Sequence, residues 1–212
     1  MYIQWAIKGI WGGRDGLSDS DAKSLIDSDQ GIQCNWWRAV HRISPPEIRS
    51  KLIPQNLSMH VNQYDATDPT TGMPFRKGTP FISLTSGCVE RNIFFQTNTV
   101  FPAKATALAF ATESGLHEGY LFYCWVIVGL NPAVEIEGVS EEVRELNSYR
   151  SYSAYQTEGE ITAKIYIPAN QIHRCEKYSV DRSGRPNMTP DWTHSNPKFS
   201  DPAPVTNLRE AF

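Results

Sequence analysis

The feature that most constrains the fold is an apolar run from Gly119 to Val128. The run reads GYLFYCWVIV, contains no charged residue, and is followed shortly by Asn131-Pro132. A membrane-spanning helix needs about 18 apolar residues, so this run is too short to span a bilayer. Its β-branched and aromatic residues favour extended backbone. The sequence therefore predicts a buried strand here.

Other short elements flank this strand on both sides. Polar and acidic caps, proline in a first turn and an alanine-rich run predict helical segments. Residues 54–80 are rich in turn signals and are predicted to be loop. The predicted strands are Asn35–Ile43, Pro80–Thr85, Ala133–Glu137, the glutamate-rich run from Glu158, and Ile172–Val180; the predicted helical segments are Ser18–Ile26, Pro45–Arg49, Ala103–Thr112 and Ser140–Arg144. Such a mixture of short elements predicts an α+β protein.

Composition narrows the class of protein. The 212 residues fit one domain with or without tails, and the net charge of −3 gives no global reason to expect a polyanionic partner. The four cysteines occur singly, which favours buried free thiols over a disulfide framework, although one or two bridges remain possible. The N-terminus lacks the pattern of a signal peptide. We therefore expect a protein without a membrane segment, located in the cytoplasm or delivered to a target cell.

The segment around Gly159 carries two carboxylates, Glu158 and Glu160. If this segment is a strand, its side chains alternate between faces, and both carboxylates lie on the same face. A carboxylate pair on a rigid face suits chemistry in which one group stabilises a developing cation and the other transfers a proton. Taken alone, Glu-Gly-Glu is more often a solvated strand edge or turn.

Several separated segments together resemble the ADP-ribosyltransferases of the cholera-toxin and pertussis-toxin type. An arginine segment, a strand with hydroxyl residues and the paired-glutamate strand follow one another in the family's order. The matching segments are Trp37-Arg38-Ala39 with Ser44–Ile48, Asn62–Asp65 with Thr70–Gly72, Phe81–Thr85, Tyr123–Val128 with Asn131-Pro132, and Gln156–Ile161 with Ile167–Ile172. Leu84 is a departure, because the family has a hydroxyl residue there.

The resemblance implies an ADP-ribosyltransferase-like fold. This is a split β-sandwich of two antiparallel sheets, with an NAD cleft and peripheral helices. It assigns residues 34–180 to the transferase domain, residues 1–33 to an N-terminal extension and residues 181–212 to a proline-rich C-terminal tail. Such a tail is either docked on the domain or disordered.

The resemblance also implies roles for the catalytic residues, with NAD as the donor of ADP-ribose and no metal. Glu160 is expected to hold the ribose hydroxyl and stabilise an oxocarbenium-like transition state. Glu158 is expected to polarise the acceptor or take its proton. Ser83 is expected to hydrogen-bond Glu160 and fix its rotamer.

Four residues are expected to bind NAD or to support its site: Arg38, Ser83, Thr85 and His60. The resemblance implies that Arg38 contacts a phosphate or ribose of NAD, and its forked guanidinium suits that contact. Thr85 is expected to support Ser83, and His60 to touch the adenosine side or to cap local backbone. A structural salt bridge at Arg38 and ordinary strand hydroxyls at Ser83 and Thr85 are the alternatives.

Four further residues are secondary candidates. Arg42 shares the predicted strand face with Arg38, and His41 is a second histidine near it. Tyr152 and Tyr155 lie where the family has its acceptor-recognition loop, so one of these rings is expected to stack on a substrate or to pack in the core.

The function that the resemblance implies is toxin-like mono-ADP-ribosyl transfer to a macromolecule. The acceptor is either a protein arginine or a nucleic-acid base. The protein is then either an effector or a toxin restrained by a partner, such as an antitoxin or chaperone. Two alternatives remain: an NAD glycohydrolase, in which water is the acceptor, and a non-catalytic interaction module with a degenerate transferase fold.

Overall fold

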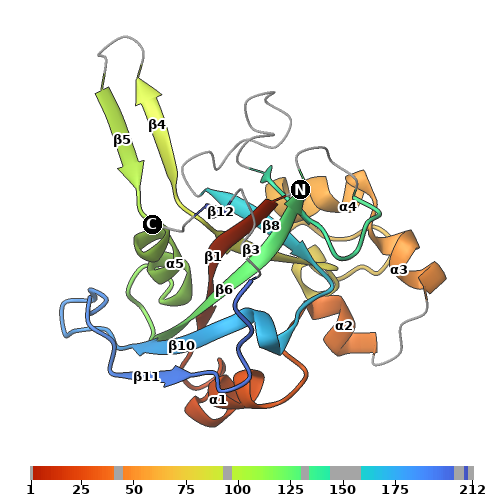
Figure 1. Ribbon diagram of the computed structural model, residues 1–212. Coiled ribbons are helices and arrows are strands. Elements are labelled where there is room, and N and C mark those ends of the chain that lie inside the picture. Colours follow the sequence, from red (N-terminus) through yellow and green to blue (C-terminus); the bar gives the residue numbers. More distant parts are fainter. Residues whose placement is uncertain are drawn as a thin grey trace.

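The computed structural model of the protein combines sheets with a small set of short helices, so the predicted mixture of α and β structure is confirmed (Figure 1). It describes residues 2–40, 45–92, 97–129, 134–143, 159–202 and 208–209. The strands of the main sheet are β1 (Tyr2–Trp11), β3 (Phe81–Thr85), β6 (Gly119–Gly129), β7 (Ser140–Glu141), β8 (Glu160–Lys164), β10 (Ile172–Tyr178), β11 (Trp192–Ser195) and β12 (Leu208–Arg209). Two smaller sheets pair β2 (Ile32–Gln33) with β9 (Tyr166–Ile167), and β4 (Cys88–Asn92) with β5 (Thr97–Phe101).

Strand β6 is the apolar run predicted from the sequence, and it lies between two long neighbours. It pairs antiparallel with β1 from Tyr2↔Val128 to Trp11↔Gly119, and with β10 along its other edge. Most of its side chains are buried. An apolar strand with a neighbour on each edge satisfies its backbone and buries its side chains together.

Five strands of the main sheet form a closed ring. Strand β1 pairs with β6 and also bridges to β3 at Ile7↔Thr85, β3 pairs with β8, and β8 bridges to β7 at Glu141↔Thr162. Strand β7 then returns to β6 in parallel. The predicted separation into two antiparallel sheets is not confirmed, because these bridges join the strands into one eight-stranded sheet.

Three predicted helices are confirmed. Helix α1 (Asp19–Asp27) begins at Ser18, whose side chain accepts a hydrogen bond from the Asp21 amide. Helix α3 (Pro45–Lys51) has proline in its first turn, and α5 (Ala103–Ala111) packs against β1 and β6. The prediction of a loop over residues 54–80 was wrong at its start. Pro54–Asn62 form helix α4, which has proline at its first helical position.

The predicted strand from Asn35 to Ile43 was wrong within the described residues. Asn35–Val40 is instead the short helix α2. The Trp36 amide donates to the Thr79 carbonyl, and the Cys34 sulfur accepts from the Trp37 amide. Only Val40 in this helix is β-branched, so the side chains do not strongly disfavour a helix. The two hydrogen bonds then stabilise the first turn of α2.

Two other predicted elements also differ. Val134–Glu137 form turns rather than a strand, and Ser140–Glu141 form strand β7 rather than a helix start. Lys164 of β8 forms an ion pair with Glu141 at 2.6 Å, and both side chains are buried. This long-range pair has no local sequence signal.

Residues at both ends of the chain take part in the main sheet. Strand β1 is one of the five strands of the ring, and β11 extends the sheet beyond β10. Phe199 contacts the rings of Trp5 and His173, and the Asn196 amide donates to the Ala169 and Ile172 carbonyls. Residues 192–202 are thus docked on the sheet. The division at residues 34 and 180 stays a prediction.

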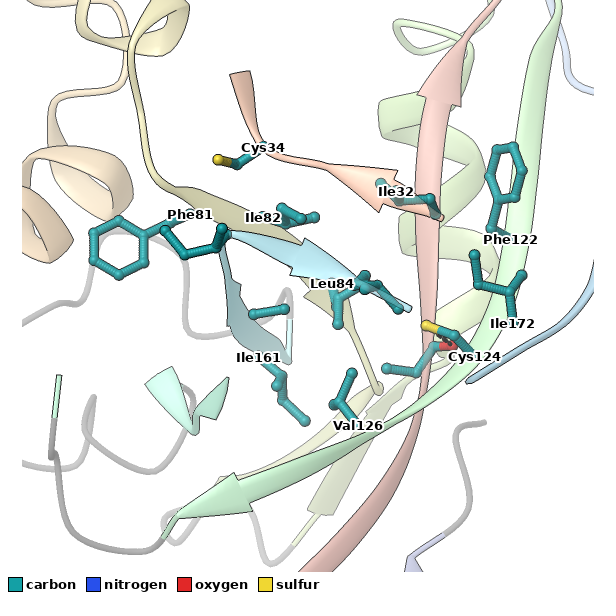
Figure 2. Packing of buried hydrophobic residues seen from close by; sticks show 14 of the residues in the cluster. Ile32, Cys34, Phe81, Ile82, Leu84, Phe122, Cys124, Val126, Ile161 and Ile172 are labelled. Carbon is teal, nitrogen blue, oxygen red and sulfur yellow. Dashed lines mark hydrogen bonds between the residues drawn. The ribbon is translucent and has the colours of Figure 1, made fainter. Parts of the chain in front are cut away.

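The hydrophobic core lies along one face of β3 and β8 and against β6 (Figure 2). Ile82 and Leu84 come from β3, Ile161 from β8, and Cys124 and Val126 from β6. Cys34, Cys124 and Cys175 are buried free thiols. Because side chains alternate along a strand, Ser83, Thr85, Glu160 and Thr162 lie on the opposite face of β3 and β8.

Candidate functional site

Glu160 is the buried carboxylate around which the candidate site is built. It is the first residue of β8 and is 6% exposed. The Thr162 hydroxyl donates to Glu160 Oε1 at 3.1 Å, and Ser83 of the paired strand lowers the pKa of the carboxyl. Burial raises the pKa of Glu160, while these two residues and the charge of Lys8 act in the opposite direction. The hydrogen bond from Thr162 therefore orients the carboxylate.

Ser83 lies beside Glu160 because β3 and β8 are paired. The register Ser83↔Thr162 and Thr85↔Glu160 places all four side chains in two adjacent rows on one face. Ser83 lowers the pKa of Glu160, as the predicted hydrogen bond would, and that bond stays a prediction. The catalytic roles of both residues stay predictions.

His60 on α4 packs behind Ser83. Its Nε2 lies 2.8 Å from Ser83 Oγ, and its Nδ1 lies 2.9 Å from Thr79 Oγ1. Burial, together with the charge of Lys8, lowers the pKa of His60 to about 3, so the ring is neutral near pH 7. At 3.8 Å from Glu160 Oε1, a neutral His60 forms neither an ion pair nor a hydrogen bond with it. Both ring nitrogens have partners within the protein, which favours a positioning role over direct contact with NAD.

Thr85 lies on the same face as Ser83 but interacts with the loop that follows β3. Its hydroxyl accepts from the Gly87 amide at 3.4 Å, and its side chain is buried. This hydrogen bond stabilises the end of β3, where Thr85 pairs with Glu160. Its predicted part in binding NAD stays a prediction.

Gly159 corrects the expected geometry of the paired glutamates. Strand β8 begins at Glu160, and Gly159 precedes it with φ of +60° rather than an extended backbone. A Cβ at Gly159 would lie 2.4 Å from the Gly87 carbonyl oxygen. The Gly159 carbonyl accepts from the Ser86 amide at 3.1 Å. Glycine is required here for both its φ and the close backbone approach. Gly159 therefore does not meet the condition of extended backbone on which the shared face of the two glutamates was predicted, and the face of Glu158 stays a prediction.

Replacing Gly159 with Ala is expected to destabilise the protein by about 2–4 kcal/mol, because it adds the cost of a left-handed backbone to a steric clash. Gly72→Ala is a matched control, because Gly72 has φ of +68° but a Cβ added there would meet no atom within 4 Å. It isolates the backbone cost of about 1–2 kcal/mol. Denaturant unfolding measures both changes. Equal losses in the two variants would contradict the assigned clash.

Lys8 is a charged residue, electrostatically linked to Glu160, that the sequence analysis missed. It lies on β1 and is partly buried, on the same strand face as Ala6 and Ile10 of the core. Burial lowers the pKa of Lys8 to about 8, and the negative charge of Glu160 partly offsets this effect. A lysine within the apolar segment Trp5–Ile10 was the available signal. The resemblance instead assigns the first 33 residues to an extension.

Arg38 is exposed on α2 rather than placed on a strand between apolar neighbours. Its Nη2 donates to Asn35 Oδ1, and the Asn35 side-chain amide donates to the Arg76 carbonyl at 2.6 Å. Its charge contributes to lowering the pKa of Lys8, after the larger effect of burial. Contact with NAD stays a prediction.

Several predicted site residues lie outside the described residues. They are Glu158, His41, Arg42, Tyr152 and Tyr155. The described residues contain no group of three or more His, Cys, Asp or Glu side chains that could hold a metal ion. In the same ranges, no helix has the length and apolar character needed to cross a membrane.

Comparisons with known proteins give only distant similarities. No family model matches the chain, and no curated protein matches it. EcPltA is 11% identical with a TM-score of 0.49, covering 96% of this chain and 90% of its own. A mutant of heat-labile enterotoxin is 13% identical with a TM-score of 0.47, covering 92% and 76%. The catalytic domain of the mosquitocidal toxin from Bacillus sphaericus is 13% identical with a TM-score of 0.40, covering 97% and 63%. Similarities at TM-scores below 0.5 do not establish a function, which must rest on this chain's own residues.

Proposed function

We propose that the protein is an NAD-dependent mono-ADP-ribosyltransferase that transfers ADP-ribose to a macromolecule and releases nicotinamide. The observation that carries this proposal is the buried Glu160 carboxylate, which accepts a hydrogen bond from Thr162 and lies on the same strand face as Ser83. The motif order described from the sequence supports the same chemistry.

The chemistry requires a fixed negative charge beside a developing cation. When the bond between nicotinamide and ribose breaks, its electron pair leaves with nicotinamide, which becomes neutral, and positive charge develops on the ribose. A carboxylate held in place by hydroxyl donors stabilises that charge without reorganising during the reaction. Because Glu160 is largely shielded from water, its electrostatic effect on a nearby charge is stronger than in bulk solvent.

The cations Lys8 and Arg38 suit the anionic part of the donor. Lys8 and Arg38 would neutralise the pyrophosphate of NAD, with Arg38 able to form two parallel hydrogen bonds. These contacts would set the pyrophosphate on the side of β1 and α2. Thr85 would support this edge of the site through the loop after β3.

The rate of NAD cleavage is expected to have a bell-shaped pH dependence. Glu160 must be ionised, so the rate rises with pH through a pKa that lies above the usual glutamate value. Lys8 must be charged, so the rate falls as pH rises through about 8. The other charged or titratable groups around Lys8 are Arg38, Cys124 and His60, and His60 is already neutral there. Initial rates at constant ionic strength measure the profile. A Lys8→Met variant should lose the fall above about pH 8, and an unchanged profile in that variant would contradict the role of Lys8.

The acceptor is identified by label transfer. Purified protein is incubated with NAD labelled in its adenylate part and with a cell lysate, and label is measured in protein, RNA and DNA fractions. Label that depends on Glu160 in one fraction supports transfer and defines the class of acceptor. Free ADP-ribose without labelled macromolecule would show a glycohydrolase. Intact NAD would contradict both activities.

The proposal includes a biological role: the protein acts as a toxin or as a delivered effector. An antitoxin or a chaperone would restrain it in the cell that produces it. Co-expression with genes adjacent to that of this protein would test for a restraining partner. A neighbour that restores growth and co-purifies with the protein would support it.

A further inference from the structure

A row of hydrogen-bonded side chains leads from the protein interior to Glu160. Thr79, His60 and Ser83 follow one another along this row, and Thr79 and His60 are 1% and 4% exposed. Thr79 Oγ1 lies 2.9 Å from His60 Nδ1, and His60 Nε2 lies 2.8 Å from Ser83 Oγ. Ser83 lies on the strand face of Glu160 and lowers its pKa, and Thr79 Oγ1 accepts from the Phe81 amide at 3.2 Å.

The proton positions in this row are fixed by counting donors. An ionised Glu160 accepts only, so a Ser83 hydroxyl directed at the carboxylate gives its single proton to it. Ser83 Oγ must then accept from His60, which places the ring proton on Nε2. A neutral ring carries one proton, so Nδ1 is an acceptor and takes the hydroxyl proton of Thr79. The oxygen of Thr79 meanwhile accepts the Phe81 amide proton.

We propose that Thr79 is a positioning residue for the reaction at Glu160: it holds His60 in the Nε2-protonated tautomer and thereby keeps the Ser83 hydroxyl directed at the carboxylate. All the donors in the row point toward Glu160, so each bond polarises the next. The catalytic consequence rests on the proposed function, whereas the tautomer of His60 does not.

The opposite arrangement shows what Thr79 prevents. If the ring proton were on Nδ1, Nε2 would accept from Ser83, and the Ser83 hydroxyl would turn away from Glu160. The carboxylate would then keep only the hydrogen bond from Thr162 among those described. Without the Thr79 hydroxyl, neither ring tautomer has a partner at Nδ1, and the preference for Nε2 protonation is lost.

The kinetic test compares Thr79→Val with Thr79→Ser. Valine keeps the shape of threonine and removes the hydroxyl, whereas serine retains it. We expect Thr79→Val to lower kcat for NAD cleavage about tenfold with KM for NAD changed less than about twofold, and Thr79→Ser to remain near the wild-type rate. Thr112→Val is the matched control, because Thr112 is also fully buried but bonds to Leu108 and Gly115 near the end of α5. It should leave kcat unchanged.

Nitrogen-15 NMR of the histidine ring provides a readout that needs no activity. In the wild-type protein, Nδ1 of His60 should resonate as an unprotonated ring nitrogen and Nε2 as a protonated one. Thr79→Val should populate both tautomers, and Thr79→Ser should restore the wild-type spectrum. A proton on Nδ1 in the wild type would overturn the proposal, and so would an unchanged tautomer together with a lowered kcat in Thr79→Val. If wild-type protein cleaves no NAD, the proposed function fails, and the His60 spectra still decide the role of Thr79.

Discussion

Replacing Glu160 with Gln is expected to lower the rate of NAD cleavage by about 100-fold or more. Glutamine keeps the shape of the side chain, and its amide oxygen can still accept from Thr162. What it loses is the negative charge that would stabilise the ribose cation. The loss should therefore appear in kcat, measured by release of nicotinamide under saturating NAD.

Two controls separate loss of charge from loss of fold. Thermal unfolding of Glu160→Gln should show a protein at least as stable as the wild type, because a buried charge has been removed. Glu113→Gln changes an exposed carboxylate that lies near His117, and it should cleave NAD at the wild-type rate. Glu158→Gln is the complementary variant, expected to lose transfer while NAD cleavage persists. A Glu160→Gln protein that is folded and fully active would refute the proposed mechanism.

Replacing Glu141 with Ala is expected to lower the free energy of unfolding by about 3–5 kcal/mol. Lys164 Nζ donates to Glu141 Oε1 at 2.6 Å and to the Ile136 carbonyl at 3.0 Å. Burial raises the pKa of Glu141 and lowers the pKa of Lys164, so each charge is retained at a cost that the partner offsets. Removing Glu141 leaves a buried ammonium without its counter-charge. Denaturant unfolding at pH 7 measures the loss.

The matched comparisons are a double variant and an exposed pair. Glu141→Leu combined with Lys164→Met removes both charges, so most of the loss should be recovered. Asp65→Ala breaks the exposed ion pair with Arg76, and it should change stability by less than about 1 kcal/mol. If Glu141→Ala lowered the free energy of unfolding no more than Asp65→Ala, the buried ion pair would not stabilise the closure of the ring at β7.

The parts of the fold that could be predicted are those with a continuous local signal. The apolar run of β6, the alanine-rich α5 and the alternation in β3 each specify their own element. Ser83 could be linked to Glu160 only through the family resemblance, and the pairing of β3 with β8 puts the two side chains on one face. No local signal indicated the bridges that close the ring, because each joins residues far apart in the chain.

The candidate site was predicted least well where charge and backbone depend on tertiary contacts. Lys8 is electrostatically linked to Glu160 only because β1 pairs with β6 and β3. Arg38 lies on a helix because Cys34 and Thr79 supply partners for the amides of its first turn. Gly159 has its φ because the backbone of Gly87 lies against it. None of these contacts can be inferred from neighbouring residues.

The place of β1 in the ring has a consequence for how the protein folds. Trp11 and Gly119, the pair nearest in sequence between β1 and β6, are already about 110 residues apart. Such distant contacts make folding slow, because a long loop must close before they form. During translation, β1 leaves the ribosome before β3, β6 and β8, so it cannot form these pairings until they have been synthesised. The site is therefore assembled only after most of the chain has been synthesised.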